Sequence, residues 1–126
     1  MEKEYDDWNK LKKDLSTKKS KVFFHKGDVW YISLGKNIGD EEDGKNQYFE
    51  RPVLITRKFN NHIFIGVPLT SQEKSGKYYH KLISFPGSTV VLSQVRLFDA
   101  KRLLRHIGKV ESTELKEIKL KIGEIV

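Results

Sequence analysis

The sequence predicts one mainly β domain, a small barrel or sandwich with short helices. Beyond residue 21, most of the chain consists of short runs that alternate between apolar and polar residues or are rich in branched apolar residues. Glycine, asparagine and proline separate these runs where tight turns are expected. A length of 126 residues fits a single domain with one modest core. We therefore expect a compact β fold and not a βαβ fold.

The first 21 residues differ from the rest of the chain and predict a helical extension followed by a basic linker. Apolar residues recur there at roughly helical spacing, with acids early and lysines late, an order that suits the helix dipole. We expect this helix to dock on the main domain; the alternative is that it extends a binding surface. The predicted boundary lies between this extension, 1–21, and a main domain, 22–126. The apolar positions of the extension are Tyr5, Trp8, Leu11 and Leu15.

The main domain begins with a run of predicted strands. Asn60-Asn61 separates two apolar runs and suits the positive φ angles of a tight hairpin. Pro86-Gly87 is expected to form a later turn. The strands that we expect cover residues 29–34, 52–57, 62–67, 78–85, 89–92 and 95–98.

Two helices are expected to close the chain. Asp99 is placed to cap a short helix that ends at Gly108. Ser112 is placed to cap a final helix with a single apolar stripe. That stripe consists of Leu115, Ile118, Ile122 and Ile125.

Composition narrows the functional classes. Lysine and arginine number 24 against 17 acids, a formal charge of +7, which favours nucleic acid, an acidic protein or an anionic membrane surface as partner. A merely basic soluble protein is the alternative. The absence of cysteine excludes disulfides, zinc–thiolate sites and thiol catalysis, and is compatible with the reducing cytoplasm that we expect. No apolar run is long enough to span a bilayer, so we expect no membrane-embedded segment.

Three short segments carry side chains suited to chemistry. The acidic loop at residues 39–44 (GDEEDG) is interpreted either as a solvated turn, as a site for a hard cation, or as the source of a carboxylate base. Arg51 opens an apolar strand, where its guanidinium can clamp a phosphate or pair with Glu50. Thr70 and Ser71 end another strand, where their hydroxyls can donate to a phosphate oxygen or satisfy the backbone.

The remaining polar residues give weaker signals. The four histidines fall on different predicted elements, and no Ser-His-Asp order is evident. His80 lies among tyrosines and a lysine, so it is either an RNA-facing residue or a half-buried strand residue. A basic face on the predicted 99–108 helix is either solvated or follows a phosphate backbone. It consists of Lys101, Arg102, Arg105 and His106.

Several segments follow one another in a particular order. They are residues 27–34 (GDVWYISL), a loop with Gly39, Glu41 and Gly44, residues 51–55 (RPVLI), 67–71 (VPLTS) and 91–99 (VLSQVRLFD), then Arg102-Leu103 and Ile107-Gly108. In this order they resemble the MazF/PemK family of toxin endoribonucleases over about residues 27–125. The ordered set carries the resemblance, since each fragment alone is a weak signal.

The resemblance implies an SH3-like small barrel of the MazF/PemK/CcdB type, with the N-terminal helix as an addition and a C-terminal helix. It also implies a homodimer with an RNA groove across it, a cognate antitoxin protein, and sequence-selective cleavage of single-stranded RNA without a cofactor or metal. Catalytic roles are implied for Arg51 and Thr70, and Glu41 corresponds to the loop glutamate of the family. Two features depart from the family pattern: the lengthened segment 45–50 and Ser93 in place of an acid.

The implied reaction is attack of a 2′-hydroxyl on the adjacent phosphorus, which leaves a 2′,3′-cyclic phosphate and a 5′-hydroxyl. Arg51 would stabilise the phosphoryl charge, Thr70 would bond a non-bridging oxygen, and Glu41 would act as the base or position Arg51. The alternatives are a non-catalytic nucleic-acid or protein-binding module on the same barrel, or a gyrase-poison-like toxin. The residues that we expect to contact RNA are Ser71, Gln94, His80, Lys77, Trp30, Tyr48 and Phe49.

Overall fold

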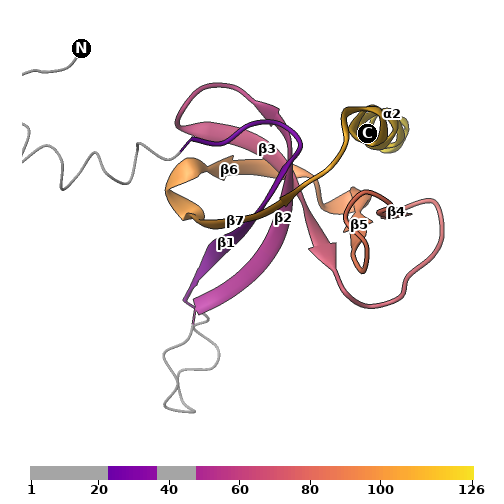
Figure 1. Cartoon of the computed structure of the whole chain (residues 1–126), viewed down its shortest axis with the longest axis horizontal. Helices are drawn as coiled ribbons and strands as arrows, with labels where there is room; N and C mark the ends of the chain where they lie inside the picture. Colours follow the sequence, from indigo (N-terminus) through magenta and orange to yellow (C-terminus); the bar gives the residue numbers. More distant parts are fainter. Residues whose placement is uncertain (1–22, 37–47) are drawn as a thin grey trace, which may run out of the picture.

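The computed structural model of the chain describes residues 23–36 and 48–126 (Figure 1). The expected helix within 1–21 and the acidic loop at 39–44, Glu41 included, lie outside the described residues. The elements, in chain order, are β1 (Asp28–Lys36), β2 (Tyr48–Lys58), β3 (Ile63–Thr70), β4 (Tyr79–Lys81), β5 (Thr89–Val91), the 3₁₀ turn η2 (Leu92–Gln94), β6 (Arg96–Asp99), the 3₁₀ turn η3 (Ala100–Arg102), β7 (Leu103–Lys109) and α2 (Ser112–Ile125).

The strands form one antiparallel sheet in the order β4-β5-β3-β2-β1-β7, with β6 paired to β3 off this path. The long strands β1, β2 and β3 form its centre, and the short strands flank them (Figure 1). No pairing joins β4 to β7 in the part of the chain that the structure describes, so this sheet is open. The mainly β prediction is confirmed, but the word barrel applies to this sheet only loosely.

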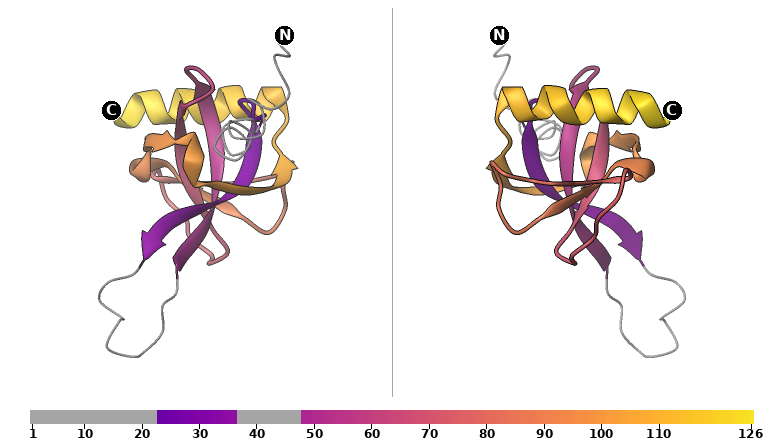
Figure 2. Two further views of the ribbon diagram at one scale, coloured as in Figure 1. Left: turned by 90° about the vertical axis from the view of Figure 1, so that its left-hand side faces the viewer. Right: turned by 90° about the vertical axis from the view of Figure 1, so that its right-hand side faces the viewer.

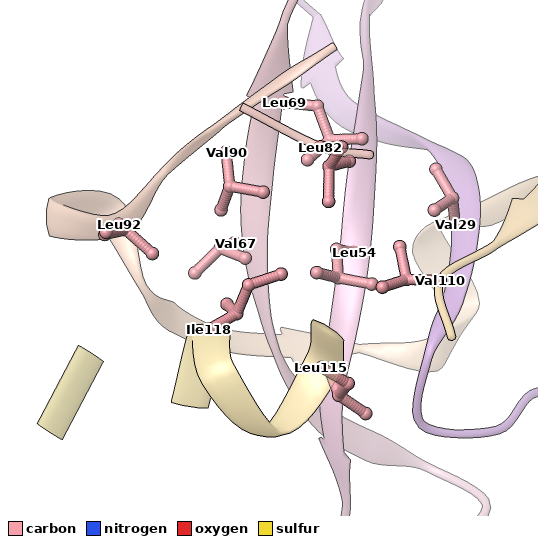
Figure 3. Packing of buried hydrophobic residues seen from close by; sticks show 10 residues of the cluster. All are labelled: Val29, Leu54, Val67, Leu69, Leu82, Val90, Leu92, Val110, Leu115 and Ile118. Carbon is pink, nitrogen blue, oxygen red and sulfur yellow. The ribbon is translucent and has the colours of Figure 1, made fainter. Parts of the chain in front are cut away.

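The central strands are buried on both faces, which explains why residues 53–55 form an unbroken apolar run. Because successive side chains of a strand point to opposite faces, Leu54 belongs to one hydrophobic cluster and Val53 and Ile55 belong to another. The first cluster, shown in Figure 3, lies between the sheet and α2. The second contains two aromatic ring contacts, Phe24 with Phe64 and Phe64 with Phe98.

Helix α2 covers the first cluster with the apolar stripe that the sequence predicts. Leu115 and Ile118 are buried, and Ile122 and Ile125 pack against the same cluster from positions nearer the end of the helix. Figure 2 shows α2 lying across the strands, and Figure 3 shows Leu115 and Ile118 directed toward the sheet. The helix begins at Ser112 with Glu111 as its N-cap, so the predicted Ser112 cap is wrong by one residue.

The predicted helix over residues 99–108 is wrong. Asp99 does cap a turn, since its carboxylate accepts a hydrogen bond from the Lys101 backbone N–H at 2.8 Å, but that turn is only the three-residue η3. The chain then continues as β7, which pairs antiparallel with β1. Pairing with a strand more than seventy residues earlier satisfies this backbone, a partner that local spacing does not reveal.

One turn and one strand also differ from expectation, and a second turn forms as expected. The hairpin at Asn60 forms, but no non-glycine residue among those described has a positive φ; the Asn60 side chain instead accepts hydrogen bonds from the His62 and Ile63 N–H groups. The turn at Gly87 forms with a φ of 91°. The predicted strand 78–85 is reduced to β4, because the backbone N–H groups of Ile83 and Ser84 bond to a helix side chain, described below.

Candidate functional site

An open cleft forms where β2 and β3 separate. Their paired register ends at Val53 and Pro68. Proline has no N–H to donate, so Pro52 and Pro68 each remove a donor from the ladder at this end. On its other edge, β3 pairs with β5 at Leu69 and Thr70. The cleft lies at this end of the β2–β3 pairing, and the chain from the end of η2 into β6 lines it.

The cleft has a volume of about 260 Å³ and combines apolar walls with three polar side chains. We call it the Arg51 cleft. Its polar residues come from three different elements: Arg51 from β2, Gln94 from η2 and Arg96 from β6. Its apolar walls are Leu34, Val53, Pro68, Val95 and Phe98.

The structure thus brings together Arg51 and Gln94, two residues that the sequence singled out separately. Arg51 is exposed and lies opposite Ile32 in the β1–β2 register, so a rigid strand pair holds its backbone. Arg96 was missed by the sequence analysis; its guanidinium lies over the Phe98 ring at 4.7 Å. Two guanidinium groups at one open cleft suit an anion with several oxygens, since each planar fork donates more than one hydrogen bond.

Thr70 and Ser71 lie beside this cleft and are not part of its lining. Thr70 ends β3, two residues beyond Pro68, and its hydroxyl accepts a hydrogen bond from the Gln72 N–H at 3.1 Å. That bond uses the oxygen as an acceptor and leaves its hydrogen available for donation. Ser71 follows and is exposed.

Two of the expected RNA contacts are placed in the interior. Trp30 is 7% exposed, packs in the second hydrophobic cluster, and donates its indole N–H to Asp28 at 3.4 Å. His80 is 5% exposed and hydrogen-bonded at both ring nitrogens. The positions of these two side chains therefore give no support to their predicted contact with RNA.

The other expected residues are Lys77, Tyr48, Phe49 and Glu41. Lys77 is exposed, with its ammonium 5.3 Å from the centre of the Tyr78 ring. Tyr48 and Phe49 form the start of β2, where they pair with Lys36 and Gly35 of β1. Arg51 follows two residues later in the same strand. Glu41 lies outside the described residues.

A buried glutamate, Glu114 of α2, connects the helix to β4 and to the segment that follows it. Its carboxylate accepts hydrogen bonds from the backbone N–H groups of Ile83 and Ser84, each at 2.8 Å, and from the Ser84 hydroxyl. It also accepts from His80 Nε2 at 2.8 Å. Burial alone raises the pKa of Glu114, but the hydrogen bonds from Ser84, His80 and Ile83 outweigh it and lower the pKa to about 2.

A second buried carboxylate, Asp28, joins the start of β1 to β7. It accepts a hydrogen bond from the His25 backbone N–H at 2.8 Å, and its other oxygen lies 3.5 Å from His106 Nε2 and 3.7 Å from Lys109 Nζ. These contacts connect β7 to the start of β1. Sequence reasoning missed both acids; the only signal was an isolated carboxylate next to buried apolar residues.

Residues 25–126 match the family described as the PemK-like, MazF-like toxin of type II toxin-antitoxin systems. The chain belongs to this family. The recognition made from the ordered motifs is therefore confirmed. No curated protein matches the sequence at a significant level.

The fold of this MazF/PemK family member is shared by solved toxin structures. An endoribonuclease from a mycobacterial species, solved in complex with its cognate antitoxin, aligns with a TM-score of 0.64 at 15% identity, over 81% of this chain and 93% of its own. A chain of a MazE–MazF structure from Deinococcus radiodurans gives 0.63 at 16%, over 82% and 96%. The Mycobacterium tuberculosis toxin MazF-mt6 gives 0.57 at 16%, over 77% and 93%. At these identities the likeness shows the fold.

Two further findings concern the described residues as a whole. Within 23–36 and 48–126, no group of three or more histidine, aspartate and glutamate side chains is arranged to hold a metal ion. No helix in the same part of the chain has both the length and the apolar character that crossing a membrane requires.

Proposed function

We propose that this MazF/PemK family member is a metal-independent endoribonuclease that cleaves single-stranded RNA at selected sequences. The observation that carries the proposal is the Arg51 cleft, where an exposed arginine that the resemblance marks as catalytic shares an open, partly apolar cleft with Gln94 and Arg96. Guanidinium groups suit the phosphate, and amide and apolar groups suit the edges and faces of unpaired bases.

The proposed reaction is transesterification within the RNA strand. The 2′-oxygen forms a bond to the adjacent phosphorus while the bond from phosphorus to the 5′-oxygen breaks, which yields a 2′,3′-cyclic phosphate and a 5′-hydroxyl. Negative charge increases on the phosphoryl oxygens in the transition state, so a guanidinium held there lowers the barrier. Arg51 stays protonated near neutral pH and is a poor base, which makes charge stabilisation its principal role. The departing 5′-oxygen takes its proton from Arg51 or from water, and the 2′-hydroxyl gives its proton to the base or to water.

The remaining roles are proposed from the family resemblance. Thr70 donates its hydroxyl hydrogen to a non-bridging oxygen, since its oxygen already accepts from the Gln72 N–H, and Ser71 assists it. Glu41 takes the proton from the 2′-hydroxyl or orients Arg51. The formal charge of +7 raises the rate of encounter with RNA and makes binding sensitive to salt.

Partners and location are part of the proposal. The solved mycobacterial endoribonuclease that shares this fold was found in complex with its cognate antitoxin. We expect this chain to form a homodimer, to be inhibited by an antitoxin protein of its own, and to act in the cytoplasm. The boundary between an extension, 1–21, and the toxin domain, 22–126, also stays a prediction.

The test is incubation of a long single-stranded RNA with the purified protein in EDTA, followed by sequencing of the cut sites and analysis of the end groups. Discrete cuts that carry cyclic phosphates and are lost in Arg51→Ala and Thr70→Ala support the proposal. Arg57→Ala is the matched control, because Arg57 is another exposed arginine of β2 and its guanidinium lies over the Phe59 ring at 5.1 Å.

Three other results of this cleavage assay would contradict part or all of the proposal. RNA that is bound but not cut, in wild type and variants alike, contradicts the nuclease and indicates a non-catalytic binding module. Cleavage that requires added divalent metal contradicts the metal-independent mechanism. Equal cleavage by wild type and Arg51→Ala contradicts the role of Arg51.

A further inference from the structure

A second basic and aromatic hollow lies between α2 and the segment that leads into β4. It has a volume of about 450 Å³, and its lining includes Lys77, Tyr78, Tyr79, Lys121 and Glu124. We call it the Tyr78 pocket. The family resemblance assigned none of its α2 residues, and the reaction proposed above uses none of them.

A buried histidine and an exposed glutamate hold the Lys121 ammonium at the edge of this pocket. Lys121 Nζ lies 2.9 Å from His80 Nδ1 and 3.5 Å from a Glu117 carboxylate oxygen. A lysine ammonium only donates, so Nδ1 accepts and His80 carries its hydrogen on Nε2, which donates to the buried Glu114. His80 is thus a positioning residue: it fixes a cation that is itself 39% exposed.

Tyr78 and Tyr79 form the aromatic wall of this pocket, and backbone hydrogen bonds fix their position in the chain. The Tyr78 carbonyl accepts a hydrogen bond from the Leu92 N–H at 2.8 Å, and the Tyr79 N–H donates to the Gly76 carbonyl at 3.1 Å. Gly76 has a φ of +117°, a conformation that other residues rarely adopt, and it makes the turn before the two tyrosines. The Tyr78 side chain itself is 43% exposed and therefore accessible to a ligand.

The Tyr78 pocket is close to the Arg51 cleft along the chain and in space. Leu92, which bonds the Tyr78 carbonyl, is the first residue of η2, and Gln94, which lines the Arg51 cleft, is the last. Consecutive Cα atoms are about 3.8 Å apart, so at most about 8 Å of backbone separates Leu92 from Gln94. The backbones that carry Tyr78 and Gln94 are therefore close to each other.

We propose that the Tyr78 pocket binds one nucleotide of the RNA strand beyond the cleavage site, with its base stacked on Tyr78 and its phosphate paired with Lys121. This inference rests on the proposed RNA substrate and adds a subsite to it. A base presents a flat π-face to tyrosine, and a phosphate pairs with an ammonium held in place. Further lysines continue the surface, since an adjoining hollow that shares Gly76 and Tyr79 is lined by Lys74 and Lys81.

The test is fluorescence anisotropy of a labelled single-stranded oligonucleotide with 2′-O-methyl riboses, which has no 2′-hydroxyl to react. Lys121→Gln is expected to weaken binding several-fold and to reduce the slope of log affinity against log salt by about 0.7, the value for one phosphate contact on a single strand. Lys121→Arg is expected to restore both. Lys119→Gln is the matched control, because Lys119 is an exposed lysine of the same helix that is not part of the pocket lining.

Tyr78→Ala tests the stacking separately from the charge. We expect a loss of affinity of about tenfold at every salt concentration, with no change in the salt slope. Phe59→Ala is the control, because Phe59 is similarly exposed, at 46%, and directly follows β2, outside the pocket lining. The backbone bond of Tyr78 to Leu92 does not depend on the side chain, so the alanine variant retains it.

The outcomes separate the two proposals. If Lys121→Gln matches Lys119→Gln, or Tyr78→Ala matches Phe59→Ala, the subsite is refuted, whatever the RNA cleavage assay shows. If the expected losses occur while the wild-type protein cuts no RNA, the subsite stands and the nuclease does not. In an active enzyme we also expect Lys121→Gln to raise KM and leave kcat unchanged, because the contact exists before the transition state.

Discussion

Replacing Glu114 with glutamine is expected to destabilise the fold in a way that depends on pH. The native carboxylate accepts hydrogen bonds from two backbone N–H groups, a hydroxyl and the His80 ring. Glutamine has nearly the same shape, but it carries no charge and presents an NH₂ group to donors that need an acceptor. The helix α2 would lose its strongest polar connection to the segment after β4.

The pKa of Glu114 gives the size and the sign of the effect. It is lowered from 4.5 to about 2, and at about 1.4 kcal/mol for each pH unit between these values the ionised carboxylate contributes about 3 kcal/mol. Because the folded pKa is depressed, this contribution is complete above pH 4.5 and is lost as the pH falls through about 2. At pH 2.5 only about 1 kcal/mol of it remains.

The assay is urea unfolding followed by circular dichroism at pH 7 and at pH 2.5, for wild type and Glu114→Gln. The difference in free energy of unfolding is expected to be about 3 kcal/mol at pH 7 and to shrink to about 1 kcal/mol at pH 2.5. Glu117→Gln is the control, since Glu117 is 54% exposed on the same helix and its pair with Lys121 contributes less than about 1 kcal/mol. An equal difference at both pH values would show that glutamine acts by shape and not by charge, and would refute the reasoning.

Three further predictions concern the core, a close contact and the Arg51 cleft. Ile118→Ala, at a fully buried position, is expected to cost about 2–5 kcal/mol in urea unfolding, whereas Leu120→Ala, at a 71% exposed position, should cost less than about 0.5 kcal/mol. Gly108→Ala places a Cβ 2.2 Å from the Phe85 ring and is expected to lower the unfolding midpoint; Phe85→Leu in the same chain should recover part of the loss, and no recovery would contradict the clash. Arg51→Lys retains the charge but loses the planar fork, so we expect RNA cleavage at least about tenfold slower than wild type at unchanged fold stability, and wild-type rates would contradict the bidentate contact.

Much of the fold could be predicted because its signals are local. The apolar run 53–55 indicates a strand buried on both faces, and the stripe through Leu115 and Ile118 indicates one face of a helix. The segment Leu103–Lys109 could not be assigned in this way, since its strand character depends on pairing with β1, far away in the chain. Long-range pairing overrides the local helical spacing there.

The candidate site was predictable only in part, for a similar reason. Arg51 at the start of an apolar strand was a weak signal alone and was assigned through the resemblance to the MazF/PemK family; the structure places it in an open cleft. His80 and Trp30 carry suitable rings, but exposure depends on what packs over them: α2 covers the first, and the second hydrophobic cluster encloses the other. Glu114 had only a weak local signal, a carboxylate beside the buried Leu115, because its partners Ile83 and Ser84 are some thirty residues away.

The end of the β2–β3 ladder at Val53 and Pro68 has a consequence for how this toxin can change its target. Its exposed edge residues Gln94 and Arg96 are separate from the buried residues of the two hydrophobic clusters, so they can be exchanged at little cost to folding. On the proposed function, we expect exchanges at these two positions to change which RNA sequences are bound while the fold stays as it is.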